Sequence, residues 1–213
     1  MIYVSTGGSR DKTADVVSGE LLRAGVTSVE LSGGAHSGTL LNDLRALAPE
    51  IDFQIHNYFP PPKDPFVLNL GSLDPQVGER SVAHVEQAIE WCISLGGDRY
   101  SFHAGFLLDP KVDELGKRIP SRNLFDRDKS IEVFVARVGH LAEVAKNAGI
   151  TLMIENNVLS AKNALEFSAN PLLMCDPQEC LEIMGSLPAG VSQLIDVAHL
   201  KVSANSLHFD PAK

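Results

Sequence analysis

Residues 129–157 read KSIEVFVARVGHLAEVAKNAGITLMIENN, and this stretch decides the fold class. Its first part carries apolar residues three and four positions apart, which predicts an amphipathic helix over 129–148. Gly149 stands where a helix commonly ends, because glycine adopts the left-handed backbone easily. The apolar run 150–155 that follows is typical of a buried strand. A helix, a glycine and a buried strand in succession are typical of a parallel α/β protein.

The same unit recurs along the whole chain. Further strands are predicted at Ile2–Ser5, Ser28–Leu31, Ile51–His56, Arg99–His103 and Val191–Asp196. Further helices are predicted at Asp11–Ala24, Thr39–Ala48, Gly78–Leu95 and Asp176–Gly185, with long loops at Tyr58–Pro65 and Ala104–Asp128. Right-handed crossovers would wrap about six such βα units towards a (β/α)8 barrel, the TIM barrel. A doubly wound sheet is the alternative, but Gly7-Gly8-Ser9-Arg10 lacks the GxGxxG pattern that follows its first strand.

Composition and charge narrow the class of protein further. The chain has 213 residues, and 18 Lys and Arg against 27 Asp and Glu give a formal net charge of −9, which disfavours non-specific binding to nucleic acid. No run of about 18 apolar residues is present and the first residues lack a signal-peptide pattern, so we expect no membrane association. Cys92, Cys175 and Cys180 have no zinc-binding or CxxC spacing, which indicates a cytoplasmic protein whose thiols are either small core residues or bystanders.

Side chains capable of chemistry lie at the carboxyl ends of successive predicted strands. They are Glu30, His56, His103, Glu155 and Asp196. In a barrel these strand ends converge on one mouth, where the active site lies. A mixture of imidazoles and carboxylates suits a divalent metal ion such as zinc or manganese. The recurrence at one end of each strand therefore predicts a metal site.

Each of these residues also has a purely structural explanation. A lone histidine after a strand is more often hydrogen-bonded in the structure than a ligand. Glu155 follows an apolar run, so its carboxylate needs a partner, which is either a metal ion or a salt bridge to a neighbouring strand. In the structural alternative, Asp196 caps the next helix and His199 points outward.

Several segments together resemble the xylose-isomerase-like TIM-barrel superfamily, which includes sugar-phosphate isomerases and epimerases and also endonuclease IV. The resemblance covers roughly residues 50–205. The segments that carry it are His56-Asn57-Tyr58, Phe66-Val67-Leu68-Asn69-Leu70-Gly71-Ser72, Phe102-His103-Ala104-Gly105, Ile154-Glu155-Asn156-Asn157 and Leu194-Ile195-Asp196-Val197-Ala198-His199-Leu200. The fourth resembles the strand-five Glu motif of the superfamily and the last its strand-six D-x-x-H motif.

The resemblance implies roles for the residues at the strand ends. Glu155 and Asp196 match metal-binding carboxylates that both branches share. His56, His103 and His199 match histidines that bind further zinc ions in the endonuclease branch and lie beside the substrate in many isomerase-like members. We therefore expect metal ligands at Glu155, Asp196 and His199, catalytic groups at Glu155 and His103, and substrate contacts at His56, Asn157 and Glu30.

Two family ligands, a His on strand seven and a Glu on strand eight, have no counterpart before Lys213. We therefore interpret residues 1–213 as a single domain that lacks the last two βα units of the barrel. Truncation of a longer protein is favoured over a naturally open barrel, because six units leave unpaired strand edges. The second acid/base group of an isomerase would lie outside the chain.

The favoured hypothesis is a divalent-metal-dependent sugar or sugar-phosphate isomerase or epimerase, in which an enediolate-type proton transfer is assisted by Mn, Zn, Co or Mg. Its partner would be a small sugar or sugar phosphate, and a homo-oligomer is possible. The first alternative is an endonuclease-IV-like phosphodiesterase for abasic DNA, against which the net charge of −9 stands. The second is a non-catalytic barrel that acts as a binding protein.

Overall fold

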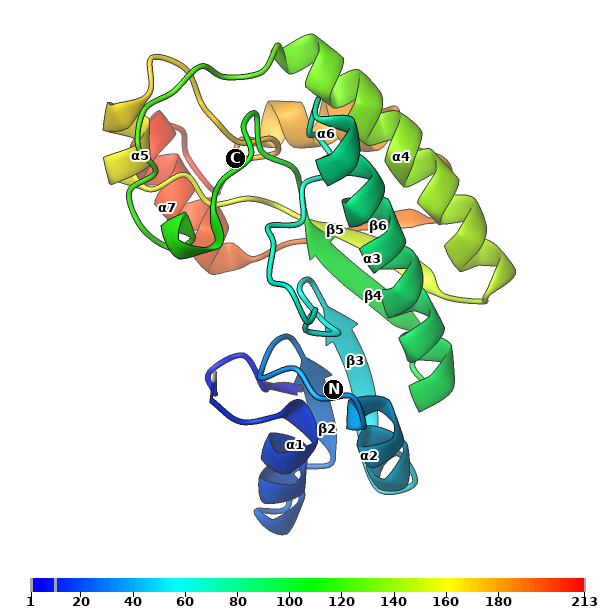
Figure 1. Cartoon of the computed structure of the whole chain (residues 1–213). Helices are drawn as coiled ribbons and strands as arrows, with labels where there is room; N and C mark the ends of the chain where they lie inside the picture. The colour runs from blue at the N-terminus through cyan, green and yellow to red at the C-terminus, as the bar shows by residue number, and fades with distance from the viewer. Residues whose placement is uncertain (1, 10, 213) are drawn as a thin grey trace.

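The computed structural model describes residues 2–9 and 11–212 and contains six parallel strands joined by helices (Figure 1). The strands are β1 (Val4–Ser5), β2 (Ser28–Leu31), β3 (Asp52–His56), β4 (Arg99–His103), β5 (Thr151–Glu155) and β6 (Val191–Leu194). The helices are α1 (Ala14–Arg23), α2 (Leu40–Leu47), α3 (Pro75–Leu95), the 3-10 helix η1 (Val112–Glu114), α4 (Arg127–Asn147), α5 (Ala161–Glu166), α6 (Pro177–Gly185) and α7 (Val197–Leu207).

The strands lie in the order β1-β2-β3-β4-β5-β6, and each strand is parallel to its neighbour. This sequential order is that of a TIM-barrel wall, whereas a doubly wound sheet reverses its strand order at a switch point. The fold class predicted from the sequence is therefore confirmed as TIM-barrel-like. All carboxyl ends of the strands point to the same side, which places their last residues together.

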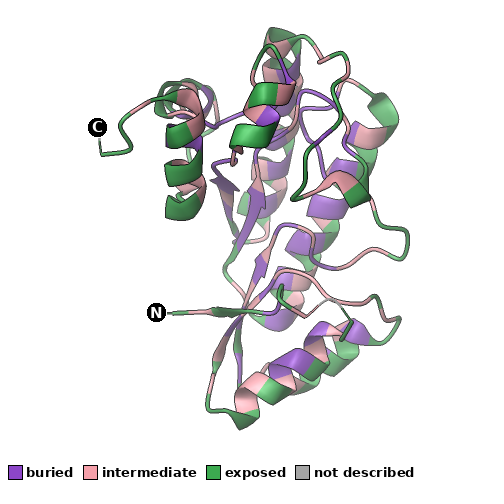
Figure 2. Ribbon diagram, turned by 90° about the vertical axis from the view of Figure 1, so that its left-hand side faces the viewer, coloured by how far each residue is buried: buried purple, intermediate pink, exposed green. Residues whose placement is uncertain are grey.

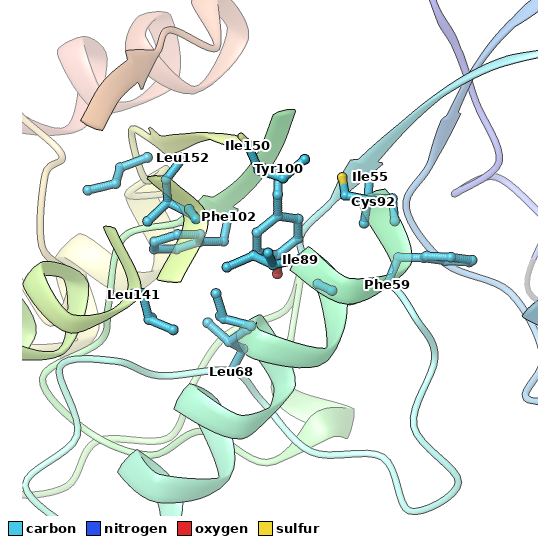
Figure 3. Packing of buried hydrophobic residues seen from close by; sticks show 14 of the residues in the cluster. Ile55, Phe59, Leu68, Ile89, Cys92, Tyr100, Phe102, Leu141, Ile150 and Leu152 are labelled. Carbon is cyan, nitrogen blue, oxygen red and sulfur yellow. The ribbon is translucent and has the colours of Figure 1, made fainter. Parts of the chain in front are cut away.

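The two faces of the sheet have opposite character, because successive side chains of a strand point to opposite sides. One face carries buried apolar residues that pack against the helices: Val29, Leu31, Phe53, Ile55, Tyr100, Phe102, Leu152 and Ile154. Figure 3 shows part of this core, where Leu68 and Ile89 approach Tyr100 and Phe102. In Figure 2 the buried colour gathers on the strands in the middle of the sheet and on the sides of the helices turned towards them, whereas β1 near the N-terminus is exposed. The inward face is polar and bears Glu30, Gln54, His56, Ser101, His103 and Glu155.

Capping residues explain where the two long helices begin. The Asp74 carboxylate accepts a hydrogen bond from the Gln76 N–H, and Pro75 takes the first helical position, so α3 begins at Pro75 instead of at Gly78 as predicted. Asp126 caps α4 in the same way through the Lys129 N–H, so this helix begins two residues before the predicted start. Both helices are 21 residues long.

The second half of the chain holds two short elements that the sequence did not predict, η1 inside the long loop after β4 and α5 after β5. The helix α7 after β6 is the one that Asp196 caps in the structural alternative. The predicted strand 191–196 ends at Leu194, because Asp196 already caps α7. These elements matter for function, since they surround the carboxyl ends of the strands.

The three cysteines are free and buried, which favours the first of the two alternatives, small core residues. Cys92 and Cys180 belong to the main core and Cys175 to a small satellite cluster. Within the described part of the chain, no helix combines the length and the apolar character needed to cross a membrane.

Candidate active site at the carboxyl ends of the strands

Three imidazole rings surround the carboxylate of Glu155, the last residue of β5. His56 Nε2 lies 3.2 Å from Glu155 Oε2, and His103 Nδ1 lies 3.7 Å from the same oxygen. On the other side, His199 Nδ1 lies 3.2 Å from Glu155 Oε1. The Glu155 residue is only 4% exposed. Residues from β3, β4, β5 and α7, far apart in sequence, are thus brought to one carboxylate.

His56 is held on both of its ring nitrogens. Its Nε2 faces a carboxylate oxygen, which can only accept a hydrogen bond, so we assign the ring proton to this nitrogen. Ser101 Oγ lies 2.9 Å from His56 Nδ1 and donates to it in this tautomer. Ser101 sits opposite His56 in the register of β3 and β4, so the sheet itself fixes the ring. His56 does not line the cavity described below, which leaves its predicted contact with substrate as a prediction.

His103 has a buried ring nitrogen without a hydrogen-bond partner. The Nδ1 atom is shielded from solvent, and the 3.7 Å to Glu155 is too long for a hydrogen bond. Burial lowers the pKa of His103 to about 4, so the ring is neutral at pH 7. A buried, unpartnered nitrogen is costly, and it is the arrangement expected where a ligand completes a site.

His199 and Asp196 form a tight unit at the start of α7. The Asp196 carboxylate accepts a hydrogen bond from the His199 N–H at 2.8 Å, so Asp196 does cap the helix, as the structural alternative predicted. The His199 ring nevertheless turns inward: its Nδ1 lies 3.0 Å from the Asn156 carbonyl oxygen, and its Nε2 lies 3.6 Å from Asp196 Oδ2. The predicted alternative of an outward-pointing His199 is therefore wrong.

Both nitrogens of His199 thus face oxygen atoms that only accept hydrogen bonds. Burial alone would lower the pKa of His199. The hydrogen bonds to Glu155 and to the Asn156 carbonyl and the nearby charge of Asp196 outweigh burial, so the pKa of His199 is raised. Burial likewise opposes ionisation of Asp196, but the hydrogen bond from His199 N–H and the His199 charge hold its pKa below the ordinary value. This corner of the site therefore favours positive charge, carried either by the ring or by a cation.

The side chains of the two asparagines after Glu155 form hydrogen bonds with backbone groups instead of pointing freely into the site. The Asn156 side chain accepts from the Asp196 N–H at 2.8 Å and donates to the Asp196 carbonyl at 3.1 Å, which locks β5 to the start of α7. No role was predicted for Asn156, although it stands directly between two predicted site residues. Asn157 Nδ2 lies within 3.1 Å of three carbonyl oxygens, those of Ala104, Gly105 and Leu173. The Asn157 side chain borders the cavity, but both its amide protons are already used.

A cavity of about 630 Å³ opens above this cluster. His103 and His199 form part of its wall, together with Tyr58 from the aromatic and proline-rich loop after β3. Much of the remaining wall comes from two segments. The loop around η1 contributes Lys117, and the segment 157–163 contributes Lys162. Among the described residues, Glu30 on β2 neither lines this cavity nor joins the ion pairs at Glu155, so its contact with substrate stays a prediction. The volume is that of a site for a small molecule.

The donor atoms fit a divalent cation. His56, His103 and Glu155 place one ligand atom each within 4.8 Å of one another, and so do Glu155, Asp196 and His199. Carboxylate oxygens with neutral imidazole nitrogens are the ligands of zinc and manganese, and the orphaned Nδ1 of His103 offers a free lone pair. The second group contains all three metal ligands predicted from the sequence.

Comparison with known proteins agrees with this geometry. A family model described as xylose isomerase-like TIM barrel matches residues 19–209. A search of curated proteins found no match.

Among solved structures, an L-ribulose 3-epimerase is similar with a TM-score of 0.66 and 20% identity, over 94% of this chain and 62% of that one. A 3-keto-D-glucoside 4-epimerase from E. coli is similar with a TM-score of 0.65 and 12% identity, over 97% of this chain and 73% of that one. A xylose isomerase-like TIM barrel protein from Mycobacterium smegmatis, solved in complex with magnesium, is similar with a TM-score of 0.63 and 16% identity, over 93% of this chain and 65% of that one. The chain spans about three fifths of the length of the first structures it matches (61%, 62% and 61%).

Proposed function

The chain belongs to the xylose isomerase-like TIM barrel family, and on this premise we propose that it is a divalent-metal-dependent sugar or sugar-phosphate isomerase or epimerase. The observation that carries the proposal is the buried Glu155 carboxylate, faced by three imidazole rings next to a cavity of about 630 Å³. Several solved structures with similar folds are described as sugar epimerases, which supports this reaction class.

Glu155, Asp196 and His199 would hold the metal ion, since their donor atoms converge and His199 already faces both carboxylates. When bound, a divalent ion makes the hydrogen on the carbon next to a sugar carbonyl more acidic, because it stabilises the negative charge of the enediolate. The mixed set of oxygen and nitrogen donors suits Mn, Zn, Co or Mg.

Glu155 would move the proton of the reacting carbon. A carboxylate can do this only if its lone pairs are directed at the proton, and the Glu155 side chain is held in place by its burial, at 4% exposure. His56 holds Oε2 through its Nε2 proton, so it orients the carboxylate. The hydrogen bond from Ser101 fixes the His56 ring in turn.

His103 would contact the sugar, because its ring lines the cavity. His103 is neutral at pH 7, so it binds a hydroxyl oxygen without adding charge. Tyr58 covers one wall of the same cavity, while Phe59 beside it is fully buried in the core against Trp91. The loop that carries Tyr58 is therefore anchored and excludes water from one side of the site.

Solvent exchange tests this function directly. The full chain, loaded with Mn²⁺, is incubated in D₂O with D-fructose, D-tagatose and D-fructose 6-phosphate, and NMR follows the hydrogens next to the carbonyl. We expect deuterium at one of these positions for at least one sugar, and none with Glu155→Gln. Exchange that is equally fast with Glu155→Gln would contradict the role of Glu155.

A second function is favoured by one specific observation, the group His56, His103 and Glu155, whose donor atoms lie within 4.8 Å of one another. In a phosphodiesterase such a group would hold an additional zinc ion. The test is cleavage of a duplex with one abasic site by the zinc-loaded chain. Strand cleavage that is lost with His103→Ala, together with no deuterium exchange into any sugar, would favour this function over the first.

A further inference from the structure

Two lysines stand on the rim of the cavity without a partner. Lys117 follows η1 and Lys162 lies in the first turn of α5, and both line the cavity with exposed side chains. Within residues 2–9 and 11–212, no side-chain hydrogen bond or ion pair is formed by either ammonium group. Figure 1 shows α5 and the green loop that holds η1 side by side, beyond the carboxyl ends of the strands.

The other charged groups of this rim are already paired. Arg122 Nη2 lies 2.6 Å from Glu114 Oε2, so the only acidic side chain that lines the cavity in the described structure is neutralised by an arginine outside it. Arg118 Nε donates to Glu166 Oε2 at 2.6 Å. The hydrogen bond from Arg122 lowers the pKa of Glu114 to about 2, which keeps this pair ionised throughout the physiological range. The net positive charge that faces the cavity therefore comes from the two lysines.

The backbone that carries the lysines is fixed. Asn163, which is 8% exposed, accepts a hydrogen bond from the Ile119 N–H at 2.9 Å and donates to the Lys117 carbonyl at 3.4 Å. Glu166 Oε1 accepts from the Ser121 N–H at 3.0 Å. The loop is thus tied to α5 at both ends of the segment, and the stems of the two lysines start from defined positions on the same rim.

We propose that Lys117 and Lys162 bind the phosphate group of a sugar phosphate whose carbonyl end lies at Glu155. The proposal rests on the proposed function and decides between the two substrate classes that it leaves open. Two unpaired cations on one cavity of a chain with net charge −9 create a local field that selects an anionic ligand. The histidines that line the cavity do not supply this selection, because His103 is neutral at pH 7 and His199 faces the carboxylates of Glu155 and Asp196.

Phosphate fits the two ammonium groups better than carboxylate does. A phosphate monoester carries a charge of about −1.5 to −2 at pH 7, which two lysines balance, whereas a carboxylate carries one charge. Planar recognition of a carboxylate also favours the arginine fork, and both arginines of this loop are occupied by glutamates.

Calorimetric titration separates these possibilities. D-fructose 6-phosphate, D-fructose and D-glucuronate are titrated into the full chain, and into Lys117→Gln, Lys162→Gln and the double variant. Lys129→Gln is the matched control, because Lys129 is exposed at the start of α4 and does not line the cavity. All titrations are repeated without added metal.

We expect the phosphate ester to bind at least about tenfold tighter than the free ketose, with each single variant losing about three- to tenfold and the double variant losing the preference. Lys129→Gln should bind like the parent chain. Equal affinities for ester and free sugar, a preference that survives the double variant, or tighter binding of glucuronate would each overturn the proposal.

The metal-free titrations distinguish this proposal from the proposed function. A lysine-dependent preference for the ester without any deuterium exchange would uphold the phosphate site and reject the isomerase. Deuterium exchange at equal rates with D-fructose and its phosphate, unchanged in the double variant, would uphold the isomerase and reject the phosphate site.

Discussion

At Glu155 three imidazole rings surround one buried carboxylate, but only two of them lie close to its oxygens. His56 and His199 reach its two oxygens at 3.2 Å, while His103 remains at 3.7 Å with an unpartnered nitrogen. A set of buried polar groups that is not fully satisfied destabilises a fold unless a ligand completes it. This incomplete satisfaction supports the proposal that the cluster binds a cation and a substrate.

Asn157 connects three backbone segments, and its loss should cost stability. Asn157→Ala removes the donor that Ala104, Gly105 and Leu173 share, so we expect a decrease of about 2 kcal/mol in the free energy of unfolding. Urea unfolding measures it, with Asn147→Ala near the end of α4 as a control. A stable Asn157→Ala variant with impaired sugar binding would instead assign this residue to the substrate, as the sequence predicted.

His84 should make the stability of the fold pH-dependent. Burial, assisted by the charge of Arg80, lowers the pKa of His84 to about 4, so the folded protein favours the neutral ring. The resulting stability is present above pH 6.5 and is lost as the pH falls from about 6.5 to 4. Compared with His84→Leu, the parent chain should lose about 2 kcal/mol more between pH 7 and pH 5. Urea midpoints at both pH values test this; parallel losses would contradict it.

For individual residues, the sequence predicted the cluster around Glu155 but not the hydrogen bonds that surround it. The α/β pattern predicted that five polar residues at strand ends lie at one side of the sheet, because parallel strands must bring their carboxyl ends together. Four of them, with His199, meet at Glu155. Asn156 and Asn163 act on backbone groups of distant loops, and no local pattern reveals such contacts. The partners of a loop depend on tertiary packing, which sequence periodicity does not encode.

Among the elements, the turn after β4 depends on a glycine. A Cβ on Gly105 would lie 2.8 Å from the Gly71 nitrogen and 2.9 Å from Asn69 Oδ1, so the two loops approach too closely for any side chain. Gly139 within α4 has room, since its nearest neighbour would be Pro188 at 4.0 Å.

Alanine at these two glycines should have opposite effects. We expect Gly105→Ala to lower the free energy of unfolding by about 2 kcal/mol or more through the backbone clash, and Gly139→Ala to raise it by about 0.5 to 1 kcal/mol through helix propensity. Thermal unfolding of both variants gives the comparison. If Gly105→Ala were neutral, the contact between the loops after β3 and β4 would not exist in solution.

Elements with a strong periodic pattern were predicted well, and short ones were not. The helix over 129–148 and the strand over 150–155 fall within two residues of α4 and β5. By contrast α5, with six residues, is too short to show helical periodicity, and for α7 the sequence indicated only the start, through the capping residue Asp196. These two helices carry Lys162 and His199, so the sequence underestimated the part of the chain that shapes the cavity.

For the whole molecule, an open sheet predicts unequal protection of its strands. β1 has two residues and a single neighbour, and Val4 is 38% exposed, whereas β4 and β5 pair over five residues in the middle of the sheet. Hydrogen exchange should therefore be fast for β1 and slowest for β4 and β5. Equally strong protection of β1 would mean that another polypeptide covers this edge, as the predicted homo-oligomer would allow.

The most direct test of the central claim is calorimetric titration of Mn²⁺ into the full chain, Glu155→Gln and Asp196→Asn, with Glu182→Gln, at an exposed position of α6, as a control. We predict saturable binding to the parent chain and the control, and a loss of affinity of about 100-fold or more in both site variants. Absence of Mn²⁺ and Zn²⁺ binding to the parent chain, or binding unchanged by Glu155→Gln, would contradict a metal centre at the ends of these strands.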